Sequence, residues 1–245
     1  MTLALPRRAS AEFAGTALLV TAVVGSGVAA ARLSPDDVGL QLLENAIATA
    51  LALGALILIF GPVSGAHFNP VVSAVDWWLG RRAGTGLHAR ELAAYVVAQV
   101  LGAASGTVLA HLMFGLPAAT WSRTVRGGSD RWLAEVVATA GLVVLVFALA
   151  RSGRGAAAPA AVGAWIGAAY WFTSSTSFAN PAVTIGRALT DTFAGIAPAS
   201  VPGFVAAQLA GGLVAVAGLA VWYPHSAGTA DAVVVPHPAP AAEAH

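Results

Sequence analysis

The chain has 245 residues, of which 58% are hydrophobic and only 9% are charged, whereas about a quarter of the residues in soluble domains are charged. This excludes an ordinary soluble protein and predicts a domain within a lipid bilayer, because apolar runs of about 20 residues recur. The net charge is +1 and all 12 basic residues are scattered arginines, which argues against nucleic acid as a partner. Without cysteine, the chain offers no disulfide, thiolate nucleophile or thiolate metal ligand.

Six apolar stretches are long enough to be membrane-spanning helices. The first follows Arg7 and Arg8 and superficially resembles a secretory signal, but it has the length of a full span and lacks a convincing cleavage site. The predicted spans cover residues 11–32, 40–60, 91–115, 132–150, 158–174 and 201–223. They predict an all-α membrane protein.

Two shorter apolar segments, 69–79 and 180–190, each open with an Asn-Pro pair. A helix of about 11 residues rises only about 16 Å, half of a bilayer. Lipid cannot solvate the irregular backbone that leads into such a helix, so each segment has to fold back inside the protein and line a wet cavity. Two soluble loops are the alternative, but the leading residues 61–68 and 172–179 are apolar or uncharged.

The two halves of the chain repeat each other. Repeat 1 covers about residues 10–115 and repeat 2 about residues 132–223, within one channel-like domain, 1–223. Three spans in each half invert the second half relative to the first, and such inverted repeats place a functional site near the bilayer midplane. The matched residues are Glu12 with Glu135, Asn69 with Asn180, and Gln99 with Gln208.

The arginines predict the orientation weakly. A cytoplasmic N-terminus and C-terminus put seven arginines inside and five outside. The inner set is Arg7, Arg8, Arg81, Arg82, Arg90, Arg151 and Arg154, and the outer set is Arg32, Arg123, Arg126, Arg131 and Arg187. The Ala- and Pro-rich end, 224–245, is predicted to be a disordered tail, whose His225, His237 and His245 reflect composition better than a metal site.

The sequences around the two Asn-Pro pairs, S-G-A-H-F-N-P-V (64–71) and S-F-A-N-P-A (177–182), resemble the paired Asn-Pro-Ala signature of aquaporins, the major intrinsic protein family. The opening A-E-F-A-G-T at 11–16 matches that family as well, and the resemblance covers about residues 10–223. It implies six transmembrane helices plus two re-entrant half-helices, forming a passive channel for water and small neutral solutes. It also implies a homotetramer surrounded by membrane lipids, with no cofactor and no catalytic activity.

The chemistry of the pore motifs follows from their residue types. Proline suits the first helical turn and asparagine is a good cap, so two positive helix ends meet at the pore centre and repel cations. The asparagine carboxamides can donate to a permeating oxygen and interrupt a proton wire. The motifs are Asn69-Pro70-Val71 and Asn180-Pro181-Ala182, and Val71 departs from the family's alanine at a position expected to pack against the opposite half-helix.

Several buried polar residues flank the motifs. Intramembrane carboxylates are costly unless they are hydrogen-bonded, and the resemblance implies that they brace the backbone ahead of the half-helices. Proton coupling by the carboxylates and pH gating by the histidine are the alternatives. These supporting residues are Glu12, Glu135, His67, Gln99 and Gln208.

The resemblance also implies a selectivity filter outward of the midplane. Counting from the second motif places it at Thr49, Ala168, Ser177 and Val183, where Val183 takes the place of the family's arginine. These small residues predict a wide opening without a fixed charge. Arg187, one turn beyond Val183, either returns positive charge to the outer vestibule or forms a surface pair with Asp191.

The run from Asn180 to Asp191 resembles a bacterial branch of the family associated with arsenic resistance, which implies arsenite or related metalloid hydroxides among the solutes and a bacterial inner membrane as the location. A secondary transporter with broken helices is the rival interpretation. It would need a coupling site, and the sequence offers no cluster of intramembrane acids beyond Glu12 and Glu135. An enzyme is disfavoured because no catalytic triad, carboxylate pair or metal-ligand spacing is present.

Overall fold

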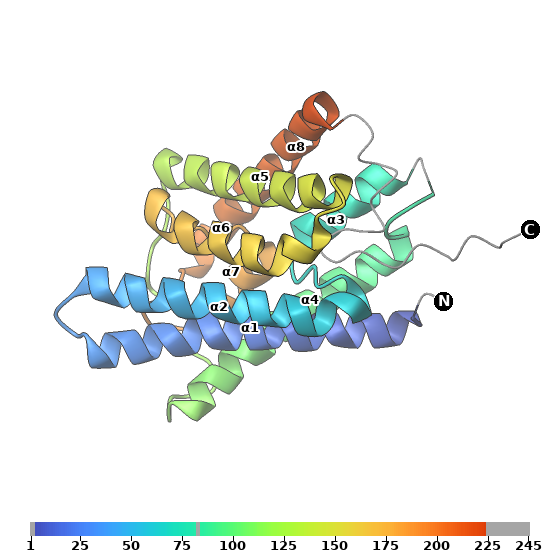
Figure 1. The fold of residues 1–245 in the computed structure, drawn as a ribbon. Coiled ribbons are helices and arrows are strands. Elements are labelled where there is room, and N and C mark those ends of the chain that lie inside the picture. Colours follow the sequence, from blue (N-terminus) through green and yellow to red (C-terminus); the bar gives the residue numbers. More distant parts are fainter. Residues whose placement is uncertain (1–2, 82–83, 224–245) are drawn as a thin grey trace, which may run out of the picture.

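The computed structural model describes residues 3–81 and 84–223, and this part of the chain contains helices and no strand (Figure 1). The predicted tail 224–245 and Arg82 lie outside the described residues. The α-helices are α1 (Leu5–Leu33), α2 (Val38–Ser64), α3 (Pro70–Gly80), α4 (Ala89–Met113), α5 (Ser129–Arg151), α6 (Ala158–Phe172), α7 (Pro181–Arg187) and α8 (Val201–Trp222), and short 3₁₀ turns, η1 (Gly155–Ala157) and η2 (Pro198–Ser200), precede α6 and α8.

Five helices in the described residues are long and apolar enough to cross a membrane, namely α1, α2, α4, α5 and α8 with its η2 turn. The predicted fifth span is α6, whose 15 residues rise only about 22 Å. The η1 turn runs directly into α6 and lengthens this helical segment. Helices α1, α2 and α5 extend beyond their predicted bounds, and α1 begins six residues before the predicted start at 11. Helices α4 and α8 end at Met113 and Trp222, slightly before their predicted ends at 115 and 223.

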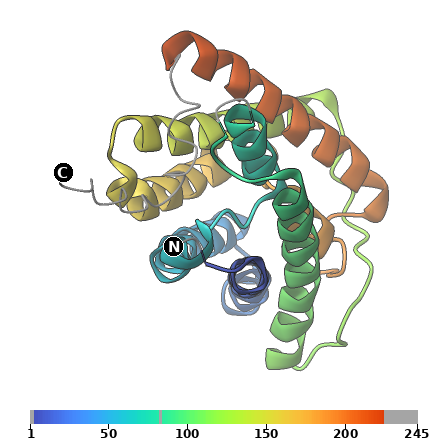
Figure 2. The same ribbon diagram turned by 90° about the vertical axis from the view of Figure 1, so that its right-hand side faces the viewer.

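The two halves of the bundle use the same set of helix contacts. In the first half α1 packs against both α2 and α4, and in the second half α5 packs against α6 and α8. Contacts between α2 and α6 and between α4 and α7 join the halves. Figure 1 shows α1 and α2 side by side, and Figure 2, which looks nearly along these two helices, shows the half-helix α3 beside α4 and α8.

Glycines let the helices of each half approach closely. A Cβ atom at Gly106 of α4 would lie 2.2 Å from the carbonyl oxygen of Ala17 in α1, and one at Gly211 of α8 would lie 2.7 Å from that of Val136 in α5. Such backbone contact needs residues without a side chain, as is common between membrane helices. The helix pairs α1–α4 and α5–α8 therefore form closely packed units.

The two half-helices begin as their sequences predict. The side chain of Asn69 accepts a hydrogen bond from the Val71 amide at the start of α3, and that of Asn180 accepts from Ala182 and Val183 at the start of α7. Helix α7 ends at Arg187, three residues before the predicted end. The next residues pair with the α4–α5 connection instead, since the amides of Thr120 and Ser122 donate to the Leu189 and Ala188 carbonyls.

Candidate pore and its supporting network

Two matching loops lead into the half-helices with a strained backbone. Ala66 and Phe68 have φ values of 51° and 49° before α3, and Ser177 and Ala179 have φ values of 48° and 48° before α7. Residues other than glycine rarely adopt this left-handed backbone region, so other interactions in the protein have to stabilise each loop.

Glu12 holds the first loop. Its Oε1 accepts hydrogen bonds from the Ser64 hydroxyl (2.6 Å) and the His67 amide (3.0 Å), and its Oε2 accepts from the Phe68 amide (2.7 Å) and the Gln99 side chain (2.8 Å). Four donors thus surround a carboxylate that is fully shielded from solvent.

Glu135 holds the second loop in the same way. Its Oε1 accepts from the Ser175 hydroxyl (2.6 Å) and the Phe178 amide (2.9 Å), and its Oε2 accepts from the Ala179 amide (2.8 Å) and the Gln208 side chain (2.6 Å). Glu135 is also fully shielded. Each glutamate thus accepts hydrogen bonds from the loop that leads into the half-helix of its own repeat.

The two repeats are tied together at their motifs. The Nδ2 atom of Asn69 donates to the Ala179 carbonyl, and Nδ2 of Asn180 donates to the Phe68 carbonyl, both at 2.7 Å. A carboxamide nitrogen carries two N–H groups. Each asparagine therefore donates one N–H group to the opposite loop and has a second N–H group that can donate to another acceptor.

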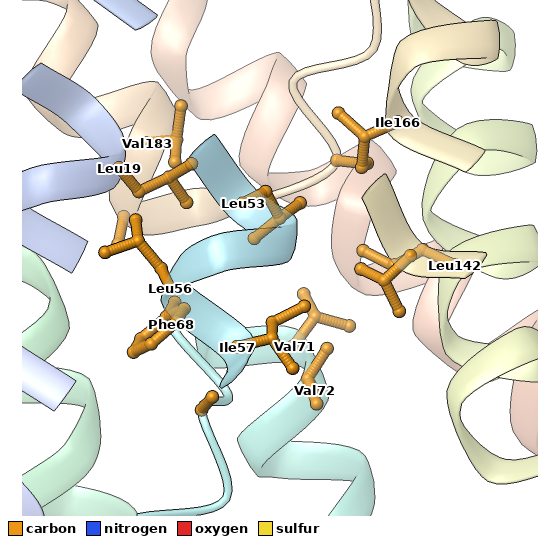
Figure 3. Close-up of a cluster of buried hydrophobic side chains, with 14 of the residues drawn as sticks. Leu19, Leu53, Leu56, Ile57, Phe68, Val71, Val72, Leu142, Ile166 and Val183 are labelled. Atoms are coloured by element: carbon orange, nitrogen blue, oxygen red, sulfur yellow. The ribbon is translucent and has the colours of Figure 1, made fainter. Parts of the chain in front are cut away.

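A cavity of about 60 Å³ lies between the repeats and has room for several water molecules. Both motif asparagines contribute to its wall, together with carbonyl-bearing loop residues on each side. The rest of the wall is mostly apolar and comes from six helices: Leu19, Val23, Leu53, Ile57, Val72, Leu142, Val146, Val162, Ile166 and Val183. Figure 3 shows Leu19, Leu53, Leu142, Ile166 and Val183 gathered from five of these helices.

Three of the four predicted filter residues, Thr49, Ser177 and Val183, lie in the cavity wall. The prediction for Ala168 is wrong, because this residue is exposed on the outside of α6. The cavity face of α6 carries Val162, Ile166 and Tyr170 instead. Residues two apart on a helix differ by about 200° in direction, so an error of two positions moved the prediction from the cavity face of α6 to its exposed face.

Tyr170 is a large wall residue with a polar group that the sequence prediction missed. It is buried, lines the cavity, and donates a hydrogen bond from its hydroxyl to Oγ1 of Thr49 at 3.3 Å. The spacing of four residues from Val162 through Ile166 to Tyr170, a helical stripe of large side chains, is a signal that could have identified it. The opening is therefore narrower on this side than four small residues would leave it.

Arg187 also lies in the cavity wall and is only 2% exposed. The alternative of a surface pair with Asp191 is wrong, since the Asp191 carboxylate binds Arg123 at 3.1 Å. A second arginine, Arg126, reaches the same region from the α4–α5 connection, and its guanidinium carbon lies 5.4 Å from the centre of the Phe178 ring. Burial, and then the charge of Arg131, lower the pKa of Arg126.

The remaining predicted residues have clear positions. His67 lines the cavity, with Nδ1 3.0 Å from the Ser73 hydroxyl and its ring against Tyr95. Val71 is buried outside the cavity wall, and a Cβ at Gly212 of α8 would lie 2.7 Å from its Cγ1. The glycine thus makes room for the methyl groups that replace the family's alanine.

An inverted bundle with two re-entrant half-helices meeting at paired asparagines defines an integral membrane protein of the aquaporin fold. The family described as "Major intrinsic protein" matches residues 1–179. The chain belongs to the major intrinsic protein family.

Its relatives include channels with solutes named in their descriptions. The chain is 54% identical to the aquaglyceroporin AqpS of Rhizobium meliloti over 213 residues, which cover 87% of this chain and 88% of that protein. It is 32% identical over 225 residues to the glycerol uptake facilitator protein of Pseudomonas aeruginosa, covering 79% and 77%. The solved structure of the aquaglyceroporin from Plasmodium falciparum shares the fold, with a TM-score of 0.63 and 17% identity over 91% of this chain and 98% of that one.

Proposed function

We propose that the chain is a passive channel through which water and small neutral solutes such as glycerol cross the membrane, with no catalytic step. The observation that carries this proposal is the make-up of the cavity wall, a mostly apolar lining to which Asn69 and Asn180 contribute hydrogen-bond donors. A hydrated ion would lose its shell there without replacement ligands, whereas a neutral hydroxyl compound needs only a few hydrogen bonds.

The bonding of the two buried glutamates supports passive rather than coupled transport. A proton-coupled transporter needs a carboxylate that can exchange protons with the solute path. Glu12 and Glu135 each already accept four hydrogen bonds and do not line the cavity. Their role in this proposal is to hold the loops.

The filter in this proposal consists of Thr49, Tyr170, Ser177 and Val183, with Arg187 beyond them. Without an arginine at position 183 the path admits solutes larger than water, and we include metalloid hydroxides such as arsenite because of the resemblance of residues 180–191. The identity with AqpS of Rhizobium meliloti supports a bacterial plasma membrane as the location. We further propose a homotetramer in lipid with both termini in the cytoplasm.

Stopped-flow light scattering of proteoliposomes tests the proposal, with water, glycerol and urea gradients applied in turn. We expect each solute to equilibrate faster than in empty liposomes, without a proton or sodium gradient. Uphill accumulation driven by either gradient would overturn the passive mechanism in favour of a transporter, and fluxes equal to the lipid background would overturn the channel itself.

A further inference from the structure

The cavity contains a fixed positive charge that the filter positions alone do not supply. Val183 is uncharged, but Arg187, one helical turn further along α7, lines the same cavity. Among the described residues no carboxylate lies within ion-pair distance of Arg187. Glu135, the buried acid of this repeat, is already occupied by its four hydrogen-bond donors.

The guanidinium of Arg187 is held on two sides. Its carbon atom lies 3.4 Å from the centre of the Phe178 ring, and Nε donates to the Ala194 carbonyl. Within the described part of the chain, its two terminal nitrogens make no hydrogen bond. One edge of the guanidinium group is therefore fixed and the other is open, and the group lies at the wall of a narrow apolar cavity. Its positive charge there repels cations that enter the cavity.

Arg126 fixes the loop on which Arg187 rests. Its Nε donates to the Gly195 carbonyl at 2.7 Å and its Nη2 donates to the Phe193 carbonyl at 3.2 Å. Two arginines thus bind three consecutive carbonyls: Arg126 binds those of residues 193 and 195, and Arg187 binds that of residue 194. The backbone amide of Arg126 in turn donates to the Ser200 hydroxyl at 3.0 Å, which anchors this clamp to the start of α8.

We propose that Arg187 is the residue that excludes cations at this end of the pore, in place of an arginine at position 183, and that Arg126 is a positioning residue that holds Arg187 through the 193–195 carbonyls. Set back by one turn, the charge repels cations without narrowing the passage beside Val183. The inference rests on the proposed channel function and identifies what lets a wide filter remain selective against charge.

Urea and guanidinium form a matched pair of probes, because they have nearly the same size and shape and differ in charge. Proteoliposomes with the wild-type protein should pass urea and hold back guanidinium. Arg187→Gln keeps an N–H donor for the Ala194 carbonyl but removes the charge, so the guanidinium-to-urea permeability ratio should rise on the order of tenfold or more. A sodium current across planar bilayers should rise with it, while water flux is retained.

Two further variants separate position from charge. Arg126→Gln leaves Arg187 intact but loosens the 193–195 loop, so the ratio should rise by a smaller factor, and Arg126→Lys should restore part of the selectivity. Arg123→Gln is the control, because it removes the same charge from a side chain that is 88% exposed and paired with Asp191. It should leave the ratio unchanged.

The outcomes are decisive because neutral and charged probes report separately. If the wild-type protein passes water and urea no faster than empty liposomes do, the proposed channel is contradicted. If it passes guanidinium as freely as urea, only the role of Arg187 is overturned. A folded Arg187→Gln protein that still blocks guanidinium and sodium would also overturn it. If Arg187→Gln loses water flux, Arg187→Met takes its place, because it also removes the charge and keeps an unbranched side chain. Unchanged guanidinium exclusion in this folded variant would then refute the proposal.

Discussion

The hydroxyl of Tyr170 donates to Oγ1 of Thr49 at 3.3 Å, which joins α6 to α2 on the wall of the cavity. We expect Tyr170→Ala to widen the passage and raise the ratio of glycerol to water permeability severalfold in proteoliposomes. Ala168→Phe is the control, because Ala168 is exposed on the other side of α6. Equal effects of the two substitutions would contradict this assignment of the cavity face.

Val183 is smaller than the arginine that the family resemblance predicts at this position. Val183→Arg adds a long cationic side chain to the wall, so glycerol flux should fall far more than water flux, since a single file of water needs the smallest gap. Thr49→Phe should act in the same direction by bulk alone. The measurement is the glycerol-to-water permeability ratio in matched vesicles, with Val183→Leu as an uncharged control. An unchanged ratio in folded Val183→Arg protein would remove Val183 from the filter.

Asn69 and Asn180 combine a structural bond with a free donor. Replacing both with aspartate keeps the caps but removes the N–H groups that bind the Ala179 and Phe68 carbonyls, and it places negative charge in the pore. We expect reduced solute flux or a new cation leak, measured by stopped-flow scattering and bilayer current. A folded double variant with wild-type selectivity would exclude both residues from the mechanism.

The Glu135 carboxylate stabilises the second loop through four accepted hydrogen bonds. Glu135→Gln turns one acceptor into a donor that faces other donors, which should cost about 3 kcal/mol of the free energy of unfolding, the usual scale for a broken buried network. The melting temperature in detergent should fall clearly. Asp36→Asn, at an exposed acid, should leave it unchanged, and an equally stable Glu135→Gln protein would show that the network does not hold the loop.

Much of the fold could be predicted from the sequence because hydrophobic length and Asn-Pro pairs report on local constraints. The half-helix starts at Pro70 and Pro181 follow directly from proline geometry and asparagine capping. The pairing of Glu12 with Glu135 was visible as a repeat, although the four hydrogen bonds to each carboxylate were not. Such bonds depend on how two distant loops turn back into the bundle.

The filter was harder to predict, because it depends on the rotation of each helix about its own axis. Counting along the sequence without gaps predicts Ala168, and an offset of two residues is enough to replace Tyr170 with an exposed alanine. Arg187 and Asp191 have the spacing of a helical pair, but α7 ends at Arg187, so Asp191 lies beyond the helix and binds Arg123. Local spacing cannot show where a short helix stops.

The crossed hydrogen bonds between the two asparagine motifs have a consequence for biogenesis. The first repeat leaves the ribosome before Ala179 and Asn180 exist, so the Asn69 carboxamide and the Phe68 carbonyl at first lack their partners. An unsatisfied polar group within hydrocarbon costs several kcal/mol. We therefore expect α3 to stay in contact with water until α7 has been translated, and to insert only then.

A cysteine-labelling experiment tests this order of insertion. The chain contains no cysteine, so a single cysteine at Ser73 would report the exposure of α3 to water by its labelling in nascent chains of increasing length. Labelling should stop only once residues beyond Arg187 have emerged, and protection at shorter lengths would show that the first repeat closes by itself.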